Sequence, residues 1–280
     1  MYKRVLAAVN EFTNSELAAR YAIALSQSCQ AKLSLVFVAE EGIDKDTLKQ
    51  AESALERLLV EADGRGIEVE SIIKTGDPFQ KIYDIVNKDN IDIVFTATRR
   101  EDVSKRLFIK TLARQLMIKL PCSVAMARVV RMGKIFPKNI LVPLRGRMTH
   151  LEERACFIGK LGQAFNAQVT LFYQHSPIKS FLHGEIHLKP AEREEYIPKD
   201  IEKFTECLKR YDVGHEKSTG YGAISRSITI EAARRRNDLI VMGASERSLL
   251  RSIMSGNPVE EVLRETPCNL IILRPQHETQ

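Results

Sequence analysis

Short apolar runs and amphipathic segments alternate along the chain. Between the runs, apolar residues recur at helical spacing, as Leu17, Tyr21 and Leu25 do. Five strand–helix alternations in about 140 residues predict an α/β fold with a doubly wound parallel sheet, which binds ligands beyond the carboxyl ends of its strands. In the first half, the nearly continuous apolar runs predict buried parallel strands at 3–9, 32–38, 67–74, 92–97 and 122–127.

The same order of elements occurs twice. KRVLAAVNEF at 3–12 has its counterpart in KNILVPLRGR at 138–147. Residues 76–122 are followed by their counterparts at a constant displacement of 146 residues, without a gap. Such internal repetition predicts two domains of one fold, which we place at 1–130 and 137–275.

The composition is that of a globular chain. Of 280 residues, 44% are hydrophobic and 28% are charged, and no apolar run has the roughly 18–20 residues that a membrane helix needs. The start, MYKRVLAAVNEF, contains no apolar signal segment. The five cysteines are scattered and form no CxxC pair, which disfavours a disulfide framework and a zinc site. We therefore expect a cytoplasmic protein without membrane insertion.

The net charge of +6 permits anionic partners. The chain has no Trp and only 6% aromatic residues, so nucleic acid is not an expected partner.

The strongest local pattern is DLIVMGASERSLLRSIMSGNPVEEVLRETPCNLIIL at 238–273, which predicts a strand, a loop and a helix. Asn257 is a favoured N-cap, Pro258 suits the first helical position, and Glu260 completes a capping box. The free N–H groups of such a helix start bind phosphates, and Gly243 at the strand end allows close backbone approach.

These residues resemble the universal stress protein family in its tandem two-domain form. The family's phosphate motif is Gly-x2-Gly-x9-Gly-(Ser/Thr), and the second copy has Gly243, then Glu246 in place of the second glycine, then Gly256 and Asn257. The resemblance covers nearly the whole chain. It implies two tandem doubly wound parallel five-stranded sheets, like those of the adenine nucleotide alpha hydrolases, packed as a pseudo-dimer.

The resemblance also implies a function without catalysis. The second domain is expected to bind an adenine nucleotide (AMP, ADP or ATP), with no metal predicted. Because Glu246 adds a negative charge beside the phosphates, AMP or ADP should lose less affinity than ATP relative to an intact family site. The nucleotide-binding residues implied are Pro143, Leu144, Arg145, Gln174, Gly243, Ser245, Arg247, Gly256, Asn257 and Val259.

The first copy departs further from the motif. Ala97-Thr98-Arg99-Arg100 and Lys110-Thr111 stand where the family has its glycines, so a standard nucleotide site is not expected there. Arg99, Arg100 and Lys110 leave an anion site as a hypothesis beside that of a solvated basic loop. Family members usually end the first strand with Asp, whereas this chain has Asn10 and Arg145.

Two other functions remain open. In the first, both nucleotide sites have decayed and the chain is a ligand-free interaction or scaffold protein. In the second, the chain hydrolyses ATP slowly, although no general base or metal-binding carboxylate is identifiable by spacing. The last strands, 122–127 and 268–273, are apolar sheet edges and should pair with each other within the chain as a pseudo-dimer. A homodimer is a further expectation.

Three remaining patterns favour ordinary structural roles. His183 and His187 in HGEIH lack the HExxH order and lie near prolines, which disfavours a metal site. The run 234–236 of arginines ends a predicted helix, where it complements the helix dipole and faces water. Cys122 and Cys268 occupy equivalent strand starts and are expected to pack rather than react.

Overall fold

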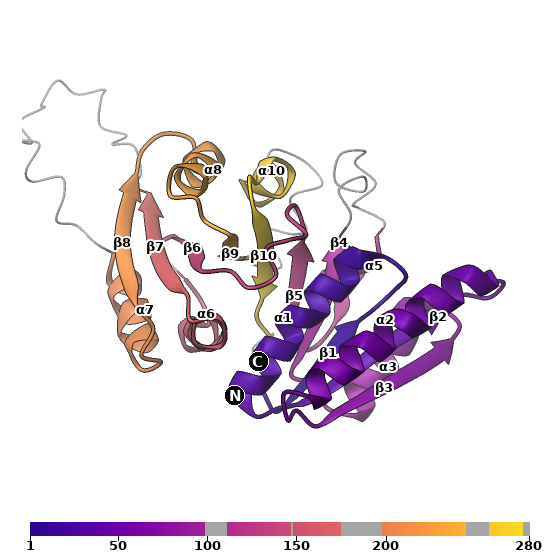
Figure 1. The fold of residues 1–280 in the computed structure, drawn as a ribbon. Coiled ribbons are helices and arrows are strands. Elements are labelled where there is room, and N and C mark those ends of the chain that lie inside the picture. Colours follow the sequence, from indigo (N-terminus) through magenta and orange to yellow (C-terminus); the bar gives the residue numbers. More distant parts are fainter. Residues whose placement is uncertain (99–110, 147, 175–197, 245–257, 277–280) are drawn as a thin grey trace, which may run out of the picture.

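The computed structural model describes residues 1–98, 111–146, 148–174, 198–244 and 258–276. Its strands form one ten-stranded sheet in the order β3-β2-β1-β4-β5-β10-β9-β6-β7-β8 (Figure 1). The strands of the first half are β1 Arg4–Ala8, β2 Lys32–Ala39, β3 Val69–Thr75, β4 Ile93–Thr98 and β5 Ser123–Arg128. Those of the second half are β6 Asn139–Leu144, β7 Gln168–Gln174, β8 His215–Gly220, β9 Leu239–Gly243 and β10 Asn269–Arg274.

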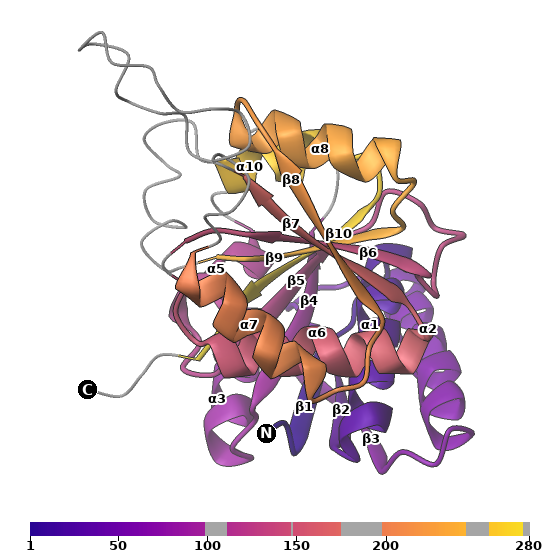
Figure 2. The same cartoon turned by 90° about the vertical axis from the view of Figure 1, so that its left-hand side faces the viewer.

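Helices cover both faces of this sheet. The helices on one face are α1 Thr13–Cys29, α2 Lys45–Asp63, α6 Leu151–Phe165 and α7 Lys199–Lys209, which pack over one hydrophobic core. Those on the other are α3 Pro78–Lys88, α5 Leu112–Lys119, α8 Ile224–Arg234 and α10 Pro258–Glu265, over a second core (Figure 2). Both cores contain residues of both halves. The predicted α/β fold with doubly wound parallel sheets is thus confirmed, with strand ends within a few residues of those expected.

The two halves meet at β5 and β10. These last strands pair antiparallel, whereas the other strand pairings described are parallel. Met126 lies opposite Ile272 in this pairing. Each of these apolar strands would be an exposed sheet edge in an isolated half, and here each covers the other.

An aspartate performs the same task in each half. The Oδ2 atom of Asp92 accepts hydrogen bonds from the N–H groups of Lys3 (2.6 Å) and Arg4 (2.9 Å) at the start of β1. Asp238, 146 residues later, accepts from Lys138 (2.9 Å) and Asn139 (3.3 Å) at the start of β6. The sequence repeat is thus also a repeat of specific contacts. No helix in the described ranges is long and apolar enough to cross a membrane.

Candidate functional site

The predicted site of the second half lies at the carboxyl ends of three adjacent strands. Gly243 ends β9, Leu144 ends β6 and Gln174 ends β7, and the sheet order places β6 between the other two. Arg145 directly follows β6. The topology therefore brings the ends of these three strands to one edge of the sheet.

Arg154 of α6 occupies the space beside Gly243. A Cβ atom at position 243 would overlap the Arg154 guanidinium. The Arg154 Nε atom donates to the Thr149 carbonyl (2.9 Å), and Nη2 lies 3.5 Å from the Ala244 carbonyl. The sequence interpretation assigned the room beside Gly243 to the approach of a phosphate. In the structure that room is taken by a cationic side chain, because α6 projects it across the end of β9.

The charge of Arg154 is poorly compensated. Burial, and to a smaller extent the positive charge of Arg145, lower the pKa of its guanidinium to about 10 against a smaller opposing effect of Glu153. Within the part of the chain that the structure describes, Arg154 forms no ion pair. Two guanidinium groups near one strand end attract an anion.

Sequence reasoning missed Arg154, although the sequence carries a signal for it. Arg154 stands in the first turn of α6, beside Glu152 and Glu153. A positive charge is disfavoured at a helix N-terminus, where the helix dipole is itself positive. A lone arginine in that position is therefore a candidate for a role outside the helix.

Gln174 and three apolar residues of the predicted set are also placed. The Gln174 Nε2 atom donates to the Gly222 carbonyl, and its buried Oε1 has no hydrogen-bond partner among the described residues. Leu144 and Val259 are buried in opposite cores. Pro143 is half-buried in β6. The remaining predicted residues, Ser245, Arg247, Gly256 and Asn257, lie outside the described residues, as does Glu246.

The helix predicted after the motif is present. The described part of α10 begins at Pro258, with Glu260 and Glu261 in its first turn. Glu261 accepts a hydrogen bond from the Ser225 hydroxyl of α8, and Glu260 forms an ion pair with Arg114. Both carboxylates of this first turn are thus engaged by groups outside the helix.

The first half contains a cavity of about 560 Å³ at the carboxyl ends of β1, β2 and β4. Its lining includes small residues such as Ala8 and Ala97, together with Thr96, Glu40 and Glu41. The sequence analysis expected no standard nucleotide site here, because the motif glycines are lacking. It did not foresee the cavity, since a hollow depends on which side chains face it from several strands.

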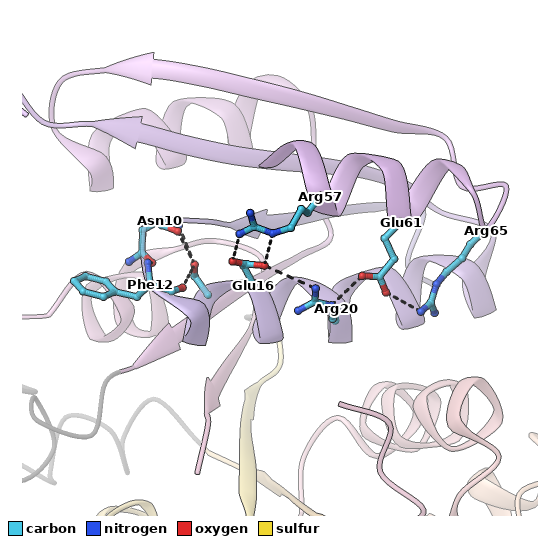
Figure 3. A network of polar contacts seen from close by, with 8 residues as sticks. Asn10, Phe12, Glu16, Arg20, Arg57, Glu61 and Arg65 are labelled. Carbon is cyan, nitrogen blue, oxygen red and sulfur yellow. Dashed lines mark hydrogen bonds and ion pairs between the residues drawn. The ribbon is translucent and has the colours of Figure 1, made fainter. Parts of the chain in front are cut away.

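Asn10, at the end of the first strand, is engaged in its own turn. Its Oδ1 atom accepts from the Phe12 N–H (3.1 Å), and the Ser15 hydroxyl donates to its carbonyl (3.0 Å). Figure 3 shows this turn beside a chain of alternating charges that ties α2 to α1. The chain of charges consists of Arg57, Glu16, Arg20, Glu61 and Arg65. This network holds α2, the helix that follows β2, against α1. The carboxyl end of β2 lines the cavity.

The other sequence candidates have structural roles or lie outside the described residues. Burial raises the pKa of Cys122 to about 12 and that of Cys268 to about 11, so both thiols are protonated. Arg234 and Arg235 bind Glu231 as well as facing water. No cluster of three metal-ligating side chains occurs among the residues described. His183 and His187 fall outside them.

The model of the universal stress protein family matches the chain at residues 1–128 and again at 137–274. A universal stress protein from Archaeoglobus fulgidus is similar over 99% of this chain and 97% of its own, at 16% identity and a TM-score of 0.63. A putative universal stress protein from Pseudomonas aeruginosa is similar over 98% of this chain and 94% of its own, at 17% identity and a TM-score of 0.59.

The cytoplasmic domain of a prokaryotic cation chloride cotransporter shares the fold over 99% of this chain and 96% of its own, at 11% identity and a TM-score of 0.58. No curated protein matches the chain significantly in sequence.

Proposed function

Because the chain belongs to the universal stress protein family in a tandem two-domain form, we propose that this stress-response protein acts by binding an adenine nucleotide in its second half, without catalysis. One observation carries the proposal. Arg154 is a partly buried cation beside Arg145 that forms no ion pair among the described residues. An anion between the two guanidinium groups would offset both the burial of Arg154 and their mutual repulsion.

The neighbouring groups suit the rest of a nucleotide. The Gln174 Oε1 atom is an acceptor without a partner among the described residues, and the amino group of adenine or a ribose hydroxyl would satisfy it. Arg145 stands where family members usually have an Asp, so contact with a phosphate replaces contact with adenosine at this position. In the proposed complex, Arg145 and Arg154 bind phosphate and Gln174 binds the nucleoside.

Titration calorimetry with adenosine, AMP and ADP tests the proposal. In the Arg154→Met variant, ADP should bind at least about tenfold more weakly, a loss of about 1.4 kcal/mol, because one charge-assisted contact is lost. Adenosine should be little affected, since it has no phosphate. Arg210→Met is the matched control, because Arg210 is an exposed arginine of the same half whose one ion pair among the described residues is with the exposed Glu152.

An equal loss for adenosine and ADP would contradict the placement of the phosphates at Arg154. Absence of binding by all three ligands to the wild-type chain would remove the proposal and leave the ligand-free interaction protein as the better hypothesis.

The cavity of the first half supports a second candidate, an uncharged nucleoside-like ligand. Its volume of about 560 Å³ is in the usual range of small-molecule sites. Glu11, Glu40 and Glu41 line it, and such carboxylates repel phosphates. This candidate predicts that adenosine binds at least as well as ADP, the reverse of the order expected for the second half.

A further inference from the structure

Equivalent residues of the two halves face each other where the halves meet. Each residue of β5 has its counterpart in β10, 146 residues later in the sequence. The same displacement relates Asp92 to Asp238. Met126 and Ile272 are such a pair, and they lie directly opposite each other in the antiparallel pairing. An approximate two-fold axis therefore passes between them. A residue on this axis contacts its own counterpart.

Arg114 of α5 and Glu260 of α10 are a second pair of counterparts on the axis, again 146 residues apart. They form an ion pair, with 3.3 Å between Arg114 Nη1 and Glu260 Oε1. The side chain of Arg114 is only 2% exposed and that of Glu260 is 26% exposed. At this pair of equivalent positions, the first half thus contributes a positive charge and the second half a negative charge to one buried contact.

Glu153 of α6 provides an independent case. Tyr2 and Ser123, both of the first half, donate hydrogen bonds to its Oε1 atom, at 3.0 Å for Tyr2. Helices α1 and α6 end in left-handed caps at Gln30 and Asn166, a displacement of 136 residues.

The same displacement makes Leu17 the counterpart of Glu153. Two first halves paired in this way would offer Tyr2 and Ser123 a leucine instead of a carboxylate.

We propose that the contact surface of each half is selective for the other half and rejects a second copy of itself. Paired first halves would place two Arg114 side chains together in a buried contact, and paired second halves would place two Glu260 side chains there. Buried like charges are strongly unfavourable, whereas the Arg114–Glu260 contact is neutral overall. The partner that fits the first half must present a carboxylate opposite Arg114. This sheet edge is therefore closed to self-association, and any oligomer of the chain uses other surfaces.

Single charge reversals in the full chain reproduce the rejected contacts. Glu260→Arg creates the Arg–Arg contact of two first halves, and Arg114→Glu creates the Glu–Glu contact of two second halves. Each should lower the urea midpoint of unfolding, and the double variant Arg114→Glu/Glu260→Arg should recover at least half of the lost shift. The matched control is the same set of reversals at the exposed pair Arg210–Glu152, which should leave the midpoint almost unchanged.

If a reversed variant does not fold, Arg114→Met, Glu260→Gln and their combination give the same comparison without like charges. The combined variant should then be more stable than the sum of the single losses predicts, because neither charge is left unpaired. Reversals as stable as the wild type, or losses that simply add in the double variants, would overturn the proposal.

Discussion

The guanidinium of Arg154 lies in the space that a side chain at Gly243 would fill. Glycine at the end of β9 thus leaves room for Arg154, and its backbone conformation is one that other residues also adopt. We predict that Gly243→Ala displaces Arg154 and weakens ADP binding at least about fivefold, an effect of about 1 kcal/mol. Calorimetric titration of the variant measures this.

Gly133→Ala is the matched control, because a Cβ at Gly133 meets no atom within 4 Å. It should leave both ADP binding and the unfolding midpoint unchanged. Wild-type affinity in Gly243→Ala would separate Arg154 from the ligand.

A second prediction concerns the stability of the fold in acid and depends on Glu231 of α8. Burial alone would raise the pKa of Glu231, but hydrogen bonds from Arg234, Ser218 and Arg235 outweigh it and lower the pKa from 4.5 to about 2. A lowered carboxyl pKa stabilises the fold fully above pH 4.5, and this contribution is lost as the pH falls toward 2. Glu231→Gln should therefore cost roughly 1–3 kcal/mol of unfolding free energy at pH 7 and much less at pH 2.5.

Urea unfolding at several pH values measures the difference between Glu231→Gln and the wild type. Glu206→Gln, an exposed position of α7, should show almost no difference at any pH. A difference for Glu231→Gln that stays constant between pH 7 and pH 2.5 would mean that the charge of Glu231 is not what stabilises the fold.

Much of the fold could be predicted from the sequence because it depends on local patterns. Apolar runs placed the strands, the repeat placed the second half, and the two apolar last strands, β5 and β10, pair with each other in the structure. A helix in this region, whose described part begins at Pro258, was also predicted from capping residues.

The details of the site depend on packing between distant segments. Arg154 and Gly243 are far apart in the sequence, and no local pattern indicates that one fills the space beside the other. The cavity of the first half likewise depends on residues of several strands. The sequence shows that equivalent positions 114 and 260 carry opposite charges once the displacement of 146 is known. It does not show that the two side chains are in contact.

The network of Figure 3 gives a prediction about the first half. Glu16 is buried on α1 and accepts hydrogen bonds from Arg57 of α2, at 2.5 Å for Nη2 and 3.3 Å for Nε. Glu16→Gln should lower the unfolding free energy by about 1 kcal/mol, since Arg57 is half-exposed and stays hydrated in the variant. The loss should shrink in 1 M salt, which screens exposed charges.

Thermal unfolding at low and high salt measures this loss. Glu56→Gln, an exposed position of α2, is the control and should have no effect at either salt concentration. An effect of Glu16→Gln that is independent of salt would point to packing rather than to charge.

The last prediction separates the two halves as ligand sites. Ala97 of β4 lines the cavity of the first half, and Ala97→Leu should fill part of it without adding a polar group. If the nucleotide binds in the second half as proposed, ADP affinity stays within about twofold of the wild type, because the substitution touches neither Arg145 nor Arg154. The unfolding midpoint, measured in parallel, shows whether the variant is folded. Loss of ADP binding in a stably folded Ala97→Leu chain, together with wild-type binding in Arg154→Met, would move the site to the first half.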